Sequence, residues 1–333
     1  MVTGRGASCG SSWTSLPVTT SLGSKAIRLV YGVDGRFAVG LAASLSSAVE
    51  HLSDGHRLEV FVIDGGLGRT HRQRLMRSFA GRGCEVRWLT PPHRKLSRLK
   101  VGGDITVATY FRLLIPELLG REISKVIYLD ADVIVHRDLG GLWVTPFTGH
   151  PVLAVQDQGV RYISGPYGLS NYRSLGIPED AKYFNAGVLL LDLEKWRREH
   201  ISDSVMQYIR DHSEHIRFHD QDGLNAVLWN RWGWLDPRWN QMPQLLQVSR
   251  IEDSPFDRLT HERTVRDPYI THFASSDKPW RYGCRHPASA DFLSALATTE
   301  YRTFRPSRWR DRWADCVHGV RSRLVRLREG LAR

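Results

Sequence analysis

Asp130 and Asp132 stand one residue apart directly after an apolar run, and this spacing suits metal chemistry. Residues 126–129 have the pattern of a buried strand, and alternation along a strand places both carboxylates on one face. Two unpaired carboxylates at a buried strand end are costly, because each loses its hydration and they repel each other. A divalent cation removes this cost and keeps coordination positions open for a diphosphate. Asp-x-Asp is also common in solvated turns, but its position after a buried strand favours the metal site.

Four further segments combine polar residues with glycine or with strand-like apolar residues. They are residues 30–34, 183–196, 219–225 and 272–280. In this order and at these separations, they and the Asp-x-Asp segment resemble the family 8 retaining glycosyltransferases. The resemblance extends over residues 26–280 and is strongest to bacterial lipooligosaccharide α-galactosyltransferases, with glycogenin and galactinol synthase as more distant relatives.

This resemblance implies a combined metal and diphosphate site. It makes His272 the third metal ligand beside Asp130 and Asp132, and an imidazole with two carboxylates suits Mn²⁺ better than Mg²⁺ or Ca²⁺. Lys278, six residues later, would hold the diphosphate as a point charge. Ser275 belongs to the same donor-binding segment, whereas Trp280 is expected to pack rather than to bind.

The resemblance also implies contacts to a UDP-hexose donor. Gly32 and Asp34 match the position that holds the uracil and ribose, and a glycine lets the chain approach the base closely. Arg36 stands where the family often has an asparagine that touches the nucleotide. The contacts to the donor sugar or phosphate are implied for Arg112, Asp157 and Asn185.

Asp220, Gln221 and Asp222 form the expected reaction centre. Retention by double displacement needs a nucleophile, normally a carboxylate, beneath the anomeric carbon. The resemblance puts the Gln221 amide nearest that carbon, and an amide is a poor nucleophile. We therefore expect front-face attack, in which the Gln221 carbonyl stabilises the developing positive charge, Asp220 binds donor hydroxyls and Asp222 is a supporting carboxylate. Capping of a helix is the alternative role for an aspartate in this position.

Alternating strands and helices must position these residues. The expected strands are residues 26–33, 58–63, 84–89, 126–129, 152–155 and 188–193. The expected helices are residues 38–52, 69–80, 105–119, 202–209 and 221–229. This alternation predicts an α/β fold with a mixed, mainly parallel sheet flanked by helices. The resemblance makes it a Rossmann-like, single nucleotide-diphosphate-sugar transferase domain of the GT-A type. Ligands of such sheets bind beyond the carboxyl ends of the strands, where Asp34 and Asp130 would lie.

The ends of the chain differ from its centre. We expect residues 1–25 to be disordered, residues 26–290 to form the transferase domain, and residues 291–333 to form a basic, amphipathic helical extension. The chain has a formal net charge of +11, and from residue 305 onward nine arginines face three acidic residues. Apolar residues recur there at steps of three and four, namely Trp309, Trp313, Val317, Val320, Leu324, Leu327 and Leu331. This pattern favours binding to an anionic membrane surface rather than to nucleic acid, although the stripe could instead dock on the domain.

The sequence thus predicts a metal-dependent, retaining hexosyltransferase that moves galactose or glucose from a UDP-sugar to a carbohydrate hydroxyl with α linkage. The acceptor is expected to be an envelope oligosaccharide or glycolipid, with a soluble glycoside or a protein as the alternative. A nucleotidyltransferase and a non-catalytic sugar-nucleotide binding module are the other classes considered. The four cysteines have no metal or redox spacing, the longest apolar stretches are strand-length, and a secretory signal is not evident. We therefore expect a cytoplasmic protein, peripheral at the inner face of the membrane.

Overall fold

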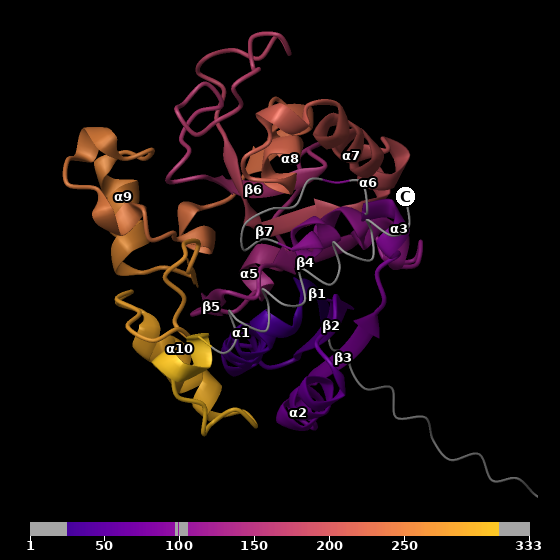
Figure 1. The fold of residues 1–333 in the computed structure, drawn as a ribbon, viewed down its shortest axis with the longest axis vertical. Coiled ribbons are helices and arrows are strands. Elements are labelled where there is room, and N and C mark those ends of the chain that lie inside the picture. The colour runs from indigo at the N-terminus through magenta and orange to yellow at the C-terminus, as the bar shows by residue number, and fades with distance from the viewer. Residues whose placement is uncertain (1–24, 97–98, 100–105, 313–333) are drawn as a thin grey trace, which may run out of the picture.

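The computed structural model describes residues 25–96, 99 and 106–312. Its centre is a seven-stranded mixed sheet with the strand order β3-β2-β1-β4-β7-β6-β8 (Figure 1). β7 alone runs antiparallel to its neighbours, so the expected mixed and mainly parallel sheet is confirmed. The strands of this sheet are β1 (Lys25–Val33), β2 (His56–Asp64), β3 (Cys84–Leu89), β4 (Lys125–Leu129), β6 (Val152–Gln156), β7 (Phe184–Asp192) and β8 (Trp232–Trp234).

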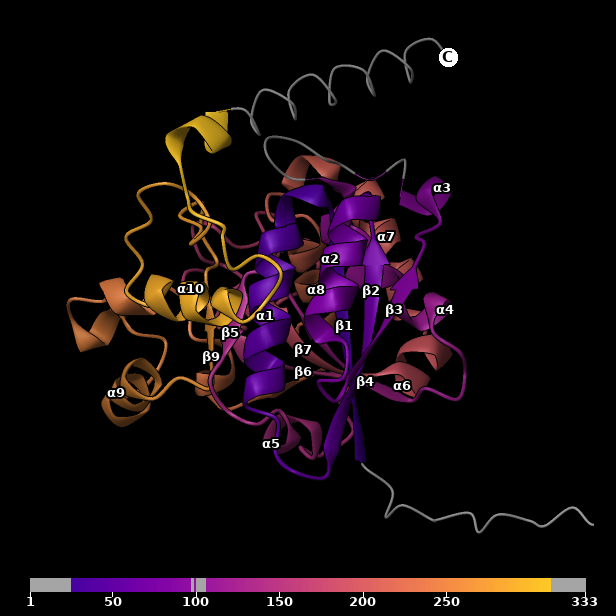
Figure 2. The same cartoon turned by 90° about the horizontal axis from the view of Figure 1, so that it is seen from below.

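Helices cover both faces of the sheet (Figures 1 and 2). The α-helices are α1 (Ala38–Glu50), α2 (Arg69–Phe79), α3 (His93–Leu96), α4 (Ile115–Leu118), α5 (Gly140–Trp143), α6 (Leu193–Arg198), α7 (Ile201–Asp211), α8 (Asp220–Leu228), α9 (Arg258–Arg266) and α10 (Ser289–Ala297). The 3₁₀ segments are η1 (Gly35–Phe37), η2 (Val107–Leu114), η3 (Ser213–His215), η4 (Pro237–Asn240), η5 (Leu245–Gln247) and η6 (Ile251–Asp253). Within the residues that the structure describes, every helix is too short or too polar to cross a lipid bilayer.

Alternation along β1 divides its side chains between two hydrophobic cores. Ile27, Leu29 and Tyr31 pack with α1, α2 and α10 on one face, and Val30 packs with η2, α7 and α8 on the other. All four are fully buried, as expected for a strand covered on both sides. The β1–β2 pairing ends at Val33 and Asp64, so the segments that follow these strands emerge at the same edge of the sheet.

The strand predicted over residues 126–129 is confirmed as β4 (Lys125–Leu129), but the expectation that strand alternation continues through Asp130 and Asp132 was wrong. β4 ends at Leu129, the chain turns at Ala131 and Asp132, and β5 (Val133–Val135) joins a separate two-stranded sheet with β9 (Ile270–His272). Strand alternation therefore does not explain how the two carboxylates are placed. The antiparallel register pairs Val133 with His272, and this long-range pairing brings His272 beside the turn.

Two other boundaries differ from the expected ones. Residues 105–119 were expected to form one helix, but the described part of this range forms η2 followed by the single turn of α4, with Pro116 in its first turn. Proline lacks an N–H and restricts the residue before it, so a continuous helix through this point is disfavoured. β7 begins at Phe184 rather than at residue 188, so Asn185 and Gly187 lie within the strand. The expectations for residues 1–24 and for the apolar stripe from Trp313 onward lie outside the described residues.

Candidate active site

The Asp130–Asp132 turn forms a polar cluster with His272. Asp130 Oδ1 accepts hydrogen bonds from Tyr128 Oη at 2.7 Å and Arg112 Nη2 at 3.0 Å. Asp132 Oδ2 lies 2.5 Å from Lys278 Nζ. The second oxygen of each carboxylate turns toward His272 Nε2, with distances of 3.8 Å from Asp130 Oδ2 and 3.5 Å from Asp132 Oδ1. Each aspartate is thus held by a protein cation on one side and offers its other oxygen to the cluster.

Asn240 sets which imidazole nitrogen of His272 carries the proton. Asn240 Nδ2 donates to Asn185 Oδ1 at 2.9 Å, so Asn240 Oδ1 is the acceptor that faces His272 Nδ1, also at 2.9 Å. With its proton on Nδ1, His272 presents the Nε2 lone pair to the two carboxylate oxygens. Ligand atoms of these three residues lie within 4.8 Å of one another. Converging lone pairs repel unless a cation lies between them, and one imidazole with two carboxylates is a donor set that fits Mn²⁺.

Gly187 of β7 provides the space for this arrangement. A Cβ atom at this position would lie 2.2 Å from His272 Cε1 and 2.9 Å from Asp130 Oδ2. Neither side chain could keep its place beside a larger residue. The strand therefore uses glycine here for close approach rather than for backbone freedom.

A buried cation, Arg112, and a half-buried cation, Lys278, balance the charge of the cluster. Burial opposes ionisation of Asp132, but the neighbouring Lys278 ammonium group outweighs it and holds the pKa of this carboxyl well below its ordinary value. The Arg112 guanidinium is buried over the Tyr128 ring, 4.5 Å from its centroid. Its burial favours the neutral form, yet Asp130 and Asp220 keep the pKa of Arg112 above its ordinary value. Arg112 therefore stays charged and links the Asp130–Asp132 turn to the start of α8.

Both carboxylate oxygens of Asp220 are engaged. Oδ1 accepts a hydrogen bond from Thr109 Oγ1 at 2.7 Å, and Oδ2 forms an ion pair with Arg112 Nε at 2.6 Å. Burial raises the pKa of Asp220, although Arg112 and Thr109 oppose this effect. Asp220 is therefore held rigidly against Arg112 at the first turn of α8.

Gln221 is fixed on both ends of its amide. Its Oε1 accepts from Ala186 N at 2.9 Å and from Asn185 Nδ2 at 3.2 Å, and its Nε2 donates to Asp157 Oδ2 at 3.2 Å. Asn185 Nδ2 also donates to Asp157 Oδ2 at 2.9 Å. A continuous chain of hydrogen bonds thus runs from His272 through two asparagines to Gln221.

Asp157 and Asp222 are saturated by local hydrogen bonds. The Oδ1 atom of Asp157 accepts from Gly159 N and Val160 N at 2.8 and 2.7 Å. Asp222 accepts from Tyr183 Oη at 2.6 Å and, through its other oxygen, from the backbone N–H groups of residues 217 and 218. Burial raises the pKa of Asp222. The Asp222 carboxylate thus organises the turn that leads into α8.

The residues expected to hold the nucleoside lie at the end of β1. Asp34 accepts hydrogen bonds from Arg36 N at 2.9 Å and Thr106 Oγ1 at 2.7 Å. Arg36 also forms an ion pair with Asp34 at 3.2 Å, so the residue that departs from the family pattern fixes this carboxylate. Gly32 has a packing role, since a Cβ there would lie 2.9 Å from Phe111 Cβ.

Ser275 and Lys278 lie in the segment that follows β9. Ser275 Oγ accepts a hydrogen bond from Asp277 N at 3.2 Å. Trp280 packs edge-on against Phe37, with ring centroids 5.5 Å apart, and this confirms its expected packing role.

The structure brings together most of the residues singled out from the sequence, but sequence reasoning missed Asn240, Tyr128 and Thr109. Asn240 lies at the end of η4, where no periodic or motif signal distinguishes it. Tyr128 belongs to the apolar β4 run, and only its hydroxyl group, two residues before Asp130, hinted at a polar role.

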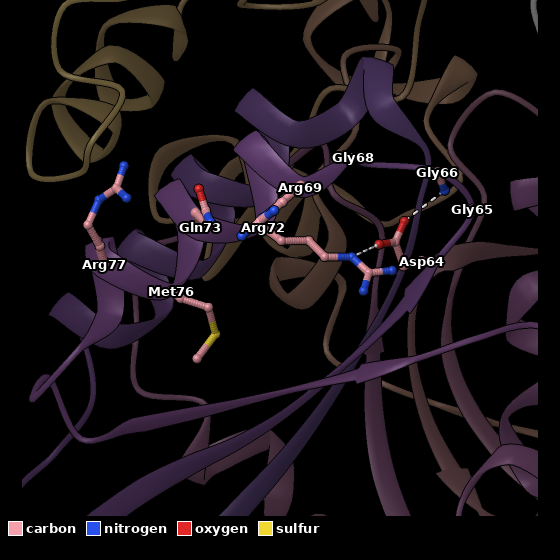
Figure 3. A pocket seen from close by; sticks show the side chains of 9 residues that line it. All are labelled: Asp64, Gly65, Gly66, Gly68, Arg69, Arg72, Gln73, Met76 and Arg77. Carbon is pink, nitrogen blue, oxygen red and sulfur yellow. Dashed lines mark hydrogen bonds and ion pairs between the residues drawn. The ribbon is translucent and has the colours of Figure 1, made fainter.

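One pocket of the described residues lies outside this polar cluster. It has a volume of about 800 Å³ and is formed by the turn after β2 and one side of α2 (Figure 3). Asp64 accepts a hydrogen bond from Gly66 N at 2.7 Å and forms an ion pair with Arg72, while Arg77 pairs with Glu300. Internal ion pairs thus engage two of the arginines that line it.

A mixed sheet flanked by helices, with this polar cluster beyond its strand ends, fits the GT-A class of transferase folds. The chain belongs to glycosyl transferase family 8, whose model matches residues 28–284. It is 28% identical to general stress protein A of Bacillus subtilis over 280 residues, which are 83% of this chain and 95% of that protein. It is 25% identical to the lipopolysaccharide 1,3-galactosyltransferase of Salmonella typhimurium, over 82% of this chain and 78% of that enzyme.

A solved structure with the same fold is the galactosyltransferase LgtC in complex with donor and acceptor sugar analogs. It superposes with a TM-score of 0.72 at 25% sequence identity and covers 86% of this chain and 99% of LgtC. Family membership identifies glycosyl transfer as the activity and sets aside the nucleotidyltransferase considered from the sequence.

Proposed function

We propose that the protein transfers galactose or glucose from a UDP-hexose to a hydroxyl group of a carbohydrate acceptor, with Mn²⁺ as cofactor and retention of the α configuration. The observation that carries this proposal is the convergence of Asp130 Oδ2, Asp132 Oδ1 and His272 Nε2. When bound by these atoms, Mn²⁺ would supply Lewis-acid charge that stabilises the departing UDP.

Different side chains of the protein bind different parts of the UDP-hexose donor. Asp34 and the backbone at Gly32 bind the nucleoside, and Lys278 and Ser275 bind the diphosphate. Arg112, Asp157 and Asn185 bind or orient the hexose. Arg112 supports this assignment because its buried positive charge touches Asp130 and Asp220 at once, which couples the diphosphate end of the site to the sugar end.

The hydrogen bonding around Gln221 favours a front-face mechanism. Double displacement would need a carboxylate free to attack the anomeric carbon, whereas Asp220 and Asp222 each have both oxygens engaged. The Gln221 amide is held rigidly by Asn185 and Ala186. Gln221 therefore acts as a fixed dipole beside the developing positive charge, and the leaving phosphate oxygen receives the acceptor proton.

The acceptor we propose is an envelope oligosaccharide or glycolipid at the cytoplasmic face of the membrane. Support comes from the lipopolysaccharide 1,3-galactosyltransferase among the relatives and from the basic end of the chain. In its described part, Trp309 is 78% exposed and stands among arginines 305, 308, 310 and 312. A tryptophan flanked by arginines suits the interface of an anionic bilayer. If the tail does not attach to membranes, a soluble glycoside or a protein becomes the preferred acceptor.

The loop over residues 159–182 has the properties of an acceptor-binding segment. It has its own small core, formed by Val160, Ile163, Leu169, Ile177 and Tyr183. The loop is therefore packed in a defined conformation. It adjoins the reaction centre because Tyr183, the residue that directly follows it, donates a hydrogen bond to Asp222.

A donor screen tests the proposal. Release of UDP is measured with UDP-galactose, UDP-glucose and the corresponding GDP-sugars, with Mn²⁺ or with excess chelator. We expect Mn²⁺-dependent UDP release from one of the two UDP-hexoses, and loss of release in Asp132→Asn but not in the control Asp203→Asn, whose side chain is 70% exposed on α7. With an acceptor in hand, NMR of the product should show an α linkage. A β-linked product, or release that is equal in chelator, would refute the proposal.

A further inference from the structure

We infer that Lys278 and a divalent cation compete for Asp132 when no donor is bound. A nucleoside diphosphate ends this competition by binding the Lys278 ammonium group, so Lys278 makes metal and donor binding cooperative. This inference rests on the proposed function, because it concerns the proposed metal and the proposed diphosphate partner of Lys278. It adds a second role for Lys278, as a competitor of the metal in addition to a ligand of the donor.

Lys278 is anchored directly on the metal-ligand cluster. Its Nζ atom donates to Asp132 Oδ2 at 2.5 Å and to the Phe273 carbonyl oxygen at 2.7 Å. The side chain of Asp132 is only 8% exposed and that of Lys278 only 18%. Solvent therefore screens this pair weakly, and a second positive charge on the same carboxylate would be repelled strongly.

The balance of charges in the cluster also disfavours a divalent cation beside Lys278. Three carboxylates, those of Asp130, Asp132 and Asp220, meet two cations, Arg112 and Lys278. This group has one net negative charge, and a divalent cation added alone would leave one net positive charge in a largely buried site. Without the lysine, the same cation would leave the group neutral.

Of the two protein cations, Lys278 is the one that can leave. Arg112 is held by Asp130, by Asp220 and by the Ala186 carbonyl oxygen, and it lies over Tyr128. Within the described part of the chain, Lys278 pairs with one carboxylate, and it follows two exposed loop residues, Ser276 and Asp277. Its flexible stem also lets the ammonium group change partners more easily than a guanidinium.

A bound diphosphate removes the repulsion between the cation and Lys278. Its oxygens can take both the ammonium group and the cation, so Lys278 can exchange Asp132 for the phosphate while Asp132 turns fully to the metal. Each ligand then removes an obstacle to the other, and by linkage the effect is reciprocal.

The test measures Mn²⁺ affinity from the electron paramagnetic resonance signal of free Mn²⁺, with and without saturating UDP. It compares the wild-type protein with Lys278→Met, which removes the charge at similar length, and with Lys278→Arg, which keeps it. Without UDP, we expect Lys278→Met to bind Mn²⁺ at least about tenfold more tightly than wild type, equivalent to about 1.4 kcal/mol. The factor by which UDP improves Mn²⁺ affinity should fall at least as much. Lys278→Arg should behave like wild type, and circular dichroism checks that all three proteins are folded.

Two results would overturn the inference in distinguishable ways. If UDP promotes Mn²⁺ binding to the wild type but Lys278→Met binds Mn²⁺ alone no more tightly, Lys278 does not oppose the metal and the proposed function stands. If the wild type binds no Mn²⁺ with UDP present, or if Asp132→Asn binds it equally well, the metal site and therefore both proposals are wrong. The second comparison does not depend on the folding of any Lys278 variant.

Discussion

Replacing Gly187 with alanine should disable the metal-ligand cluster while leaving the fold largely intact. The new methyl group would lie 2.2 Å from His272 Cε1, 2.8 Å from His272 Nδ1 and 2.9 Å from Asp130 Oδ2. Ordinary carbon–carbon contacts are about 3.5 Å, so the imidazole must retreat by about 1 Å or more. This movement would break the hydrogen bond from His272 to Asn240 and separate His272 from the two carboxylates.

The expected cost follows from two effects. Overpacking at a buried site costs roughly 1–3 kcal/mol, and alanine recovers about 0.5–1 kcal/mol of it because glycine loses more chain entropy on folding. The net loss of unfolding free energy should therefore be between about zero and about 2.5 kcal/mol. The loss of ligand geometry should lower Mn²⁺ affinity by roughly 10–100-fold, the range seen when groups that orient metal ligands are removed.

Mn²⁺ titration in the presence of UDP, together with thermal unfolding, checks this expectation. Gly141→Ala in α5 is the matched control, since its methyl group would meet only the Trp239 ring, at 3.4 Å. This control should bind Mn²⁺ like the wild type. A Gly187→Ala protein that also binds Mn²⁺ with wild-type affinity would refute the idea that close approach of His272 and Asp130 to β7 builds the metal site.

Three further predictions concern other parts of the site. Asp132→Asn should lower donor turnover by at least about 100-fold. Because it leaves Lys278 unpaired, it should also cost roughly 1.5–3 kcal/mol of unfolding free energy. Unchanged turnover in UDP-release assays would contradict this prediction. Gln221→Ala should retain measurable transfer without a covalent sugar adduct in mass spectra. Asp220→Asn should reduce transfer activity more, because it also disrupts the ion pair with Arg112. A trapped glycosyl ester on Asp220 or Asp222 would instead establish double displacement. A chain that ends at Arg305 should lose salt-sensitive co-sedimentation with anionic liposomes that the full chain has, and equal sedimentation of both would exclude the tail as the anchor.

Local hydrophobic patterns were sufficient to predict most of the sheet. β1 and β3 lie within one residue of their expected limits, because buried strands need continuous or alternating apolar residues and these are visible in the sequence. The helix expected over residues 105–119 failed because the packing of η2 and the position of Pro116 override local helix propensity.

The geometry of the site was less accessible to sequence reasoning. The relation of Asp132 to His272 depends on the pairing of β5 with β9, across more than 130 residues of sequence. His272 was found through family resemblance, not through a local pattern. Asn240, which orients His272, lies at the end of the short η4 segment, where no pattern distinguishes it from other asparagines. The engagement of Asp220 by Arg112 and Thr109 likewise depends on how α8 packs against η2.

The most direct measurement is anomalous X-ray scattering at the manganese edge from crystals grown with Mn²⁺ and UDP. The metal site proposed here predicts one strong anomalous peak bounded by Asp130 Oδ2, Asp132 Oδ1 and His272 Nε2, with the diphosphate in contact with it and Lys278 turned toward the phosphate. A peak elsewhere in a protein that has bound UDP, or no peak between these three atoms, would contradict it.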